Sequence, residues 1–309
     1  MTTSAALELV SLPLPELLAG AGHLREAVFG SRVDLCAIIN ARSGNCAMDC
    51  RFCAQSAHNR TSVEVFDLLP SDVLCARILS LAGTPVAKIG IVTSGPALNG
   101  REFDRLCGVV RSLPGEIVPR VCVSLGRLEE GQLSELASLG IRRYHHNLET
   151  AESGYARICT TQTWRQRRDT VERAVRAGLQ ACTGGLFGLG ESWEQRLEFA
   201  FSLKELGVRH IPLNFLNPHP HTPLASQPPL SAGEALRIIA VFRHILPEAT
   251  LRICGGRPLV LGGRQREMFA AGANALMTGH YLTTPGYSME DDLAMLASLG
   301  LDPDLRAAA

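Results

Sequence analysis

The chain has 309 residues, of which 46% are hydrophobic and 19% are charged, enough apolar material for one large α/β domain or two smaller ones. Lys plus Arg and Asp plus Glu number 30 each, and the resulting formal net charge of zero gives no reason to expect a nucleic-acid partner. No apolar run reaches the roughly 20 residues that cross a bilayer, and the N-terminus lacks the basic start and cleavage site of a signal peptide. We therefore expect a cytoplasmic protein that binds neither membranes nor nucleic acids.

Residues 1–33 are expected to form an N-terminal helical extension. Charged residues such as Glu8, Glu16 and Arg25 are scattered among leucines there, a pattern typical of one or two amphipathic helices. A main domain is expected over residues 34–300, followed by a C-terminal tail over 301–309.

Beyond the extension, short β-branched runs alternate with segments whose apolar residues recur at i, i+3, i+4 and i+7. Several of these helical segments end in a glycine just before the next strand, as at Gly83, Gly140 and Gly178, which is a common helix stop. The predicted strands are 35–40, 87–93, 119–125, 141–147, 179–187, 209–216, 250–254 and 273–279.

Eight β-α repeats over about 250 residues predict a (β/α)8 TIM-type barrel. A doubly wound open sheet is the alternative, but the even strand count and the lack of a G-x-G-x-x-G turn after the first strand disfavour it. The active site of a barrel lies at the C-terminal ends of its strands. Polar or thiol residues late in a strand, or just after it, are therefore the candidates for function.

Ten cysteines without an export signal are not expected to form a disulfide framework, because the cytosol keeps thiols reduced. Three of them, Cys46, Cys50 and Cys53, lie within eight positions in the loop after the first strand, spaced C-x3-C-x2-C. Structural zinc would need a fourth nitrogen or sulfur ligand, which His58 would have to supply. A [4Fe–4S] cluster takes one thiolate per iron, so three thiolates leave one iron free to bind a small ligand.

This spacing, with Phe52 before the last cysteine, resembles the signature of the radical S-adenosylmethionine (SAM) enzymes. The resemblance implies that Cys46, Cys50 and Cys53 hold a [4Fe–4S] cluster whose open iron binds SAM. It also implies that one electron from this cluster cleaves SAM to a 5′-deoxyadenosyl radical.

From about residue 14 to about residue 303, the chain resembles the biotin synthase family. The matching stretches are SGNCAMDCRFCAQS, YHHNLET, CTGGLFGLGES, PLNFL, HTPLA, LRICGGR and AGANALMTGHYLTTP, in the same order and at similar separations. The resemblance implies an enzyme that inserts sulfur into dethiobiotin to form biotin, with an auxiliary iron–sulfur cluster as the sulfur donor. It further implies a homodimer and an external electron donor such as flavodoxin or ferredoxin.

In the familiar form of the family, the auxiliary cluster is [2Fe–2S] and is held by three cysteines and one arginine. Carried over to this chain, these ligands fall at Ile91, Cys122, Cys182 and Arg252. Isoleucine cannot ligate iron, so one thiol is missing from the set.

Two other cysteines are candidates to replace the missing thiol. Cys36 lies in the first strand, and Cys254 lies two residues after Arg252, on the same side of that strand because side chains alternate. With Cys122 and Cys182 they would come from strands one, three, five and seven, and alternate strands of a barrel contribute to one interior layer. We therefore expect four thiolates at one level, able to hold a cubane-type cluster, as in a variety of the family with an all-cysteine site. The alternative is that Cys36 and Cys254 are buried apolar thiols.

Other residues match family positions that bind SAM. Thr93, Ser94 and Gly95 end the second strand, where backbone groups are expected to hold the amino group of SAM, unless they form an ordinary strand-to-helix turn. Glu149 matches an acidic residue that binds the SAM ribose, a role that suits a pure hydrogen-bond acceptor. Arg167 matches an arginine that meets the SAM carboxylate, which a guanidinium can pair bidentately.

The resemblance implies substrate residues in the same way. Asn147 and Asn214 match asparagines that contact the ureido ring of dethiobiotin, and an amide offers the donor and the acceptor that a urea needs. The alternative is that both asparagines simply cap the ends of their strands. Thr283 and Thr284 match threonines near the carboxylate tail of the substrate.

Some residues stay without a role. His145 and His146 face opposite sides by alternation and neither is assigned as a ligand, Cys159 is unassigned, and His221 stands where the family usually has glycine. Two other functions remain open: a related radical SAM enzyme acting on another small substrate, and a non-catalytic carrier of iron–sulfur clusters.

Overall fold

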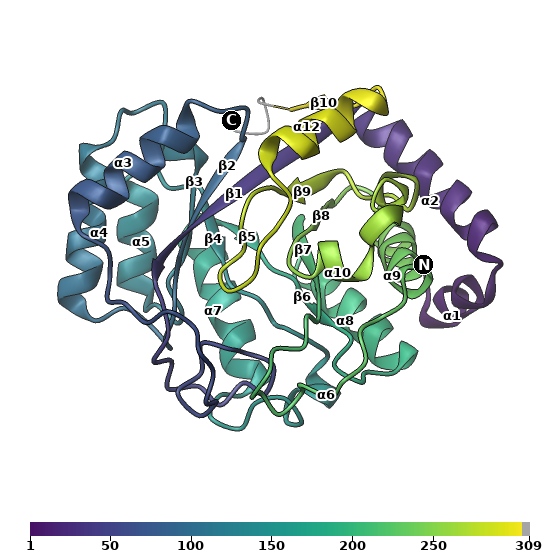
Figure 1. Cartoon of the computed structure of the whole chain (residues 1–309), viewed down its shortest axis with the longest axis horizontal. Coiled ribbons are helices and arrows are strands. Elements are labelled where there is room, and N and C mark those ends of the chain that lie inside the picture. The colour runs from purple at the N-terminus through teal and green to yellow at the C-terminus, as the bar shows by residue number, and fades with distance from the viewer. Residues whose placement is uncertain (305–309) are drawn as a thin grey trace.

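The structure is a computed structural model that describes residues 1–304, so the last five residues of the predicted tail lie outside the described part. Its centre is a closed barrel of parallel strands wrapped by helices (Figure 1). The strands are β1 (Arg32–Arg42), β2 (Lys88–Thr93), β3 (Val121–Ser124), β4 (Arg143–His145), β5 (Gln180–Cys182), β6 (Gly185–Phe187), β7 (His210–Phe215), β8 (Thr250–Ile253), β9 (Ala275–Met277) and β10 (Asp302–Pro303).

The predicted (β/α)8 barrel is confirmed. Each strand pairs with its neighbour in chain order, and β1 also pairs with β9, which closes the ring. The predicted strand 179–187 is broken into β5 and β6, and both segments pair with β7, so together they occupy one position in the barrel. The short β10, which lies in the predicted tail, pairs with β1 outside the ring.

Helices cover the outside of the barrel (Figure 1). They are α1 (Thr3–Ser11), α2 (Leu14–Phe29), α3 (Ser71–Ala82), α4 (Gly100–Ser112), α5 (Glu130–Ser138), α6 (Glu152–Tyr155), α7 (Trp164–Arg176), α8 (Trp193–Glu205), α9 (Ala232–Ile245), α10 (Arg257–Val260), α11 (Glu267–Ala270) and α12 (Met289–Ser298), with 3-10 turns at Val118–Arg120 and Gly262–Arg264. The two helices of the N-terminal extension pack against α9. No helix within residues 1–304 is long and apolar enough to span a membrane.

Local sequence fixes where the helices begin, and with them the lengths of the loops that carry the site. Asn99 and Glu102 form a capping box at the start of α4, and Thr163 and Gln166 form another at the start of α7. Such boxes satisfy backbone N–H groups that the first helical turn leaves free. Gly178 ends the segment after α7 with a φ of 86°, a conformation in which glycine avoids steric cost.

Candidate active site

Two adjoining cavities open at the C-terminal ends of the strands. The first, which we call the loop cavity, has a volume of about 170 Å³ and lies beside the loop after β1. The second, the lumen cavity, has a volume of about 380 Å³ and extends down the barrel axis. Phe52, Cys53, His145 and Glu149 line both cavities, so the two form neighbouring compartments of one site.

The predicted cysteine loop borders the loop cavity with all three thiols. Hydrogen bonds from the Cys46 N–H to the Gln55 carbonyl (3.0 Å) and from the Cys53 N–H to the Cys50 carbonyl (3.0 Å) hold the loop in shape. The Asn59 amide donates to the carbonyls of Cys50 (3.2 Å) and Cys53 (2.8 Å) and so fixes these two cysteines relative to each other. Burial raises the pKa of Cys53 to about 11, because the charged thiolate is less stable away from water.

The loop does not close into a zinc site. The ring nitrogen Nε2 of His58 lies 3.2 Å from the Ala47 carbonyl oxygen, so this side chain binds backbone rather than joining the thiols. Within residues 1–304, no group of three or more His, Cys, Asp or Glu side chains is arranged around a single metal position. Three soft thiol donors that share one open cavity fit an iron–sulfur cluster with a vacant corner better than a tetrahedral ion.

Opposite the thiols, the loop cavity is lined by an ion pair between Glu149 and Arg167. The Arg167 Nη1 lies 3.5 Å from the Glu149 carboxylate, and it also donates to the Asn147 carbonyl at 2.9 Å. Burial lowers the pKa of Arg167, but Glu149, Tyr155 and Cys50 together raise it by more than burial lowers it, so the guanidinium stays charged. A buried cation and a carboxylate here offer complementary partners for a zwitterionic ligand.

The turn after β2 forms another wall of the loop cavity, with Thr93, Ser94 and Gly95 all lining it. Arg42 pins this turn: its Nε donates to the Ser94 carbonyl at 2.9 Å, and its Nη1 pairs with Glu102 at 2.7 Å. The Ser94 hydroxyl donates to the Gly44 carbonyl at 2.7 Å and ties the turn to the cysteine loop. The turn is therefore held rigidly against the thiols.

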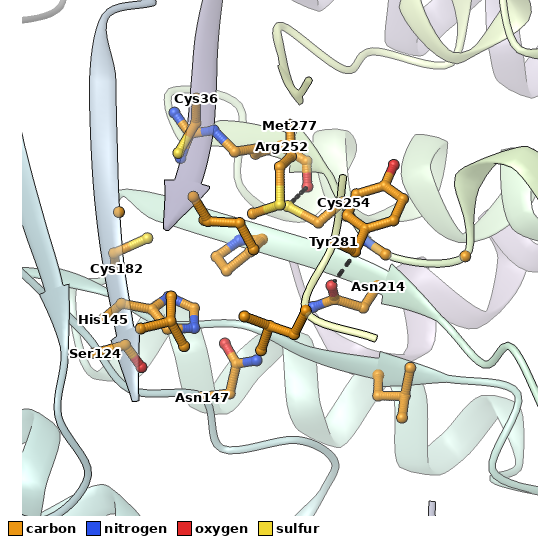
Figure 2. A pocket seen from close by; sticks show the side chains of 18 of the residues that line it. Cys36, Ser124, His145, Asn147, Cys182, Asn214, Arg252, Cys254, Met277 and Tyr281 are labelled. Atoms are coloured by element: carbon orange, nitrogen blue, oxygen red, sulfur yellow. Dashed lines mark hydrogen bonds between the residues drawn. The ribbon is translucent and has the colours of Figure 1, made fainter. Parts of the chain in front are cut away.

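The lumen is organised in layers. In an eight-stranded barrel the tilt of the strands raises the level by about one residue per strand. The observed register can be followed from Cys36 by moving from each strand to its paired neighbour, one residue further along each time. This path passes through Cys122, Cys182 and Arg252 on alternate strands and, after β9, arrives back at Cys36, so these four residues lie on one level. All four side chains line the lumen cavity, and Figure 2 shows Arg252 extending towards Cys36.

Two sequence-based assignments need correction here. Cys254 is not on the level of the other three thiols, because Arg252 occupies that level and Cys254 follows two residues later, one layer nearer the mouth. Ile91 borders the lumen cavity, but its side chain is fully buried in an apolar cluster between strands and helices, and the residue that pairs with Cys122 is Gly90. The second strand therefore contributes no thiol, and Cys36 of the first strand restores a set of three cysteines and one arginine at one level.

Hydrogen bonds and charges in this layer distinguish the thiols. The Cys122 thiol donates to Cys182, which raises the pKa of Cys122 and, with a hydrogen bond from His145, lowers that of Cys182. Burial raises the pKa of Cys36 to about 11. Burial lowers the pKa of Arg252, but Asp34 at 2.8 Å and the neighbouring cysteines together raise it by more than burial lowers it, so Arg252 stays charged in the lumen.

The predicted substrate residues lie nearer the mouth of the lumen cavity. Asn147 accepts from the Gly184 N–H at 3.1 Å, and Asn214 accepts from the Gly255 N–H at 3.0 Å, so both amides are oriented by backbone. Figure 2 shows Asn147 at the bottom of the view and Asn214 at the right, both away from Cys36 and Arg252 at the top. Thr283 and Thr284 line the same cavity on the loop after β9.

The structure gives places to residues that the sequence left without a role. His145 lines both cavities and is hydrogen-bonded to Cys182, whereas His146, which is buried just after β4, lines the loop cavity. Cys159 lies behind Cys50, and its Sγ donates to the Asp49 carboxylate at 3.2 Å. His221 has a φ of 66°, which explains why glycine would be usual there, and histidine tolerates this conformation better than most residues.

Comparison with known proteins identifies the class. The family model described as the radical SAM superfamily matches residues 41–203, more than half of the chain, and the Biotin and Thiamin Synthesis associated domain matches residues 212–302. A solved structure of methylornithine synthase covers 100% of this chain and 96% of its own with a TM-score of 0.84, at 19% identity, which supports the fold alone. The chain therefore belongs to the radical SAM superfamily.

Sequence relatives narrow the class further. Biotin synthase of Desulfovibrio desulfuricans is 68% identical over 97% of this chain and 95% of its own length. Biotin synthase of Nitratidesulfovibrio vulgaris is 46% identical over 97% of this chain and 86% of its own length. Within the superfamily, the chain belongs to the biotin synthase family.

Proposed function

We propose that this chain is a biotin synthase, an enzyme that converts dethiobiotin into biotin by inserting sulfur between two carbon atoms. One observation carries the proposal: a single continuous site has three thiols at its mouth, two oriented amides midway and a thiol layer deeper in the lumen. A reaction that activates a carbon and then supplies sulfur to it needs a radical-generating group, a substrate-binding region and a sulfur donor, placed in this order.

At the mouth, Cys46, Cys50 and Cys53 would hold a [4Fe–4S] cluster, which supplies the electron that cleaves SAM. The chain's own part is to orient SAM beside it. Arg167 would pair with the SAM carboxylate and Glu149 would accept from the ribose hydroxyls, both across the loop cavity from the thiols. The turn at Thr93 and Ser94 would hold the amino group, and Phe52 would separate SAM from the lumen.

Midway, Asn147 and Asn214 would bind the ureido ring of dethiobiotin. Because backbone N–H groups already occupy their carbonyl oxygens, each amide is held in one orientation and needs little reorganisation when the substrate binds. Thr283 and Thr284 would meet the carboxylate tail at the mouth. The substrate then fills the lumen cavity and excludes water from the reacting carbons.

Deeper in the lumen, Cys36, Cys122 and Cys182 would hold the auxiliary iron–sulfur cluster that donates sulfur. Arg252 shares their level, and Cys254 lies one layer nearer the substrate. Cys254 would be the fourth thiol of this site, and four thiolates could hold a cubane-type cluster, which takes one thiolate per iron, so we favour the cubane. A homodimeric, cytoplasmic enzyme that takes electrons from flavodoxin or ferredoxin remains our expectation.

The test is anaerobic reconstitution with iron, sulfide, SAM, a reductant and dethiobiotin, followed by mass spectrometry. Biotin and 5′-deoxyadenosine should form together. Deoxyadenosine without biotin would point to another substrate. If SAM left the EPR signal of the reduced cluster unchanged, a non-catalytic cluster carrier would be the better description.

A further inference from the structure

Below the thiol layer, the lumen ends in a layer of basic side chains that no step of the proposed reaction uses. One residue below the thiol level, the lumen-facing positions of β2, β4 and β7 are Lys88, Arg143 and His210. Lys88 and Arg143 are only 3% and 5% exposed, and both line the lumen cavity from beneath. We call these three residues the basic floor.

The basic floor lacks matching negative charge. Among residues 1–304, Asp34 is the carboxylate whose charge acts on Lys88, and one of its oxygens is already paired with Arg252 at 2.8 Å, so one negative charge faces three basic side chains, Arg252, Lys88 and Arg143. Burial, followed by the neighbouring Arg143, lowers the pKa of Lys88 to about 8, the direction expected of a cation that is buried and lies near another cation. Two buried cations beside an already neutralised pair are costly unless something negative joins them.

The floor also has hydrogen-bond donors that point at no protein atom. Arg143 uses its Nε on Gln180 at 3.1 Å, but its Nη1 is buried without a partner among residues 1–304. Nδ1 of His210 is also buried without a partner there, and it can donate in one of the two tautomers of the neutral ring. Arg252 Nε, just above, is buried and unpartnered in the same part of the chain. Buried polar groups are nearly always satisfied, so orphaned donors around a cavity indicate a missing acceptor.

We propose that the basic floor binds a small inorganic anion in the cluster-free protein, and that this anion is hydrosulfide. The proposal rests on the proposed function, in which every turnover removes sulfur from the auxiliary cluster directly above. Hydrosulfide has a single non-hydrogen atom, so a few convergent donors suffice to bind it, whereas a carboxylate or phosphate presents several oxygens that each need donors. Sulfide held beneath Cys36 and Cys122 lies where the cluster must be rebuilt.

Bromide, a spherical monoanion, serves as the probe. Crystals of reduced, cluster-free protein soaked in bromide should give an anomalous peak between Lys88 and Arg143. Calorimetric titration of the same protein with hydrosulfide should show one site, and Lys88→Met should weaken it at least 10-fold. Lys88→Arg should retain binding, and Arg209→Met should leave it unchanged, because Arg209 is the neighbour of His210 but its side chain is 75% exposed.

Lys88→Met removes an uncompensated buried cation, so thermal unfolding should show it at least as stable as the parent protein. In addition, the rate at which added iron and sulfide rebuild the auxiliary cluster, followed by absorbance, should saturate with sulfide in the parent and require at least 10-fold more sulfide in Lys88→Met.

Absence of a lumen bromide peak, or equal hydrosulfide affinity in Lys88→Met and the parent, overturns the proposal. Binding to cluster-free protein does not depend on turnover, so anion binding without biotin formation would reject the proposed function alone, and biotin formation without anion binding would reject this inference alone.

Discussion

The two thiol sites of this barrel are built in opposite ways. The site at the mouth takes three cysteines from eight consecutive positions, and a local hydrogen-bond network around Asn59 holds them. The site in the lumen takes Cys36, Cys122 and Cys182 from three strands, with 86 residues between the first two cysteines and 60 between the last two. Strand register brings these cysteines to one level. The first site is a property of a loop, and the second is a property of the whole fold.

This difference predicts separable failures. The sharpest test is Cys53→Ala, which leaves two thiols at the mouth and should abolish SAM cleavage altogether. Because the lumen ligands come from other strands, the auxiliary iron and sulfide should stay at the parent level. Iron analysis and mass spectrometry for 5′-deoxyadenosine measure the two effects on one sample. Loss of both clusters together would show that the sites are not independent.

The second test reverses the first. Cys36→Ala removes a thiol on the level of Cys122 and Cys182, so we expect it to lower auxiliary iron more than Cys254→Ala, whose thiol lies one layer higher. Both variants should still produce 5′-deoxyadenosine with dethiobiotin present, while biotin formation falls. If iron and sulfide contents matched the parent protein in both variants, Cys36 and Cys254 would not be cluster ligands but ordinary buried core thiols.

The same contrast explains what the sequence could predict. Eight strands follow from alternation and glycine stops, and the mouth site follows from the spacing of three cysteines. Cys36 could also be found, because odd-numbered strands share a lumen layer whatever the exact register. These inferences depend on periodicity, which short segments carry by themselves.

Inferences that need the exact register went wrong or were missed. The family's second-strand cysteine was placed at Ile91, one residue after Gly90, which pairs with Cys122. In a strand, a shift of one residue turns a side chain from the lumen to the layer of helices. Cys254 was predicted one layer too deep in the lumen. Alternation correctly gave the side of the strand on which it lies, but alternation does not fix its position along the barrel axis. Lys88 carries a signal in the sequence itself, because it opens the otherwise apolar strand KIGIVT, and a buried charge must meet a partner or a ligand.

The third prediction concerns the stability of the lumen layer. Arg252→Ala leaves Asp34 buried without its partner, which should destabilise the cluster-free protein by about 3–5 kcal/mol. The control is Arg209→Ala, which breaks a pair whose side chains are 75% and 71% exposed and should cost at most about 1 kcal/mol. Urea unfolding measures both. If Asp34→Asn failed to recover part of the loss in the Arg252→Ala background, the buried charge would not be its cause.

The smallest effect belongs to the outer edge of the mouth site. The Asp49 carboxylate accepts from the N–H groups of Thr160 (2.9 Å) and Thr161 (3.1 Å) and from the thiol of Cys159 (3.2 Å), and so clasps the cysteine loop to the segment before α7. Asp49→Asn turns part of this acceptor into a donor. Because the carboxylate is only partly buried, we expect a loss of about 1 kcal/mol at pH 7.

The pH dependence of that loss identifies its origin. Burial by itself raises the pKa of Asp49, but hydrogen bonds from Thr160 and Thr161 have the larger combined effect and hold the pKa well below its usual range. A carboxyl group with a depressed folded-state pKa stabilises the fold above its unfolded pKa of about 4, and this contribution is lost as the pH falls towards the folded value. The difference in unfolding free energy between the parent and Asp49→Asn should therefore be constant from pH 6 to 8 and shrink below about pH 4. A difference that stayed constant into acid would assign the loss to packing of the loop, and any change in auxiliary iron would show that the mouth and the lumen are coupled after all.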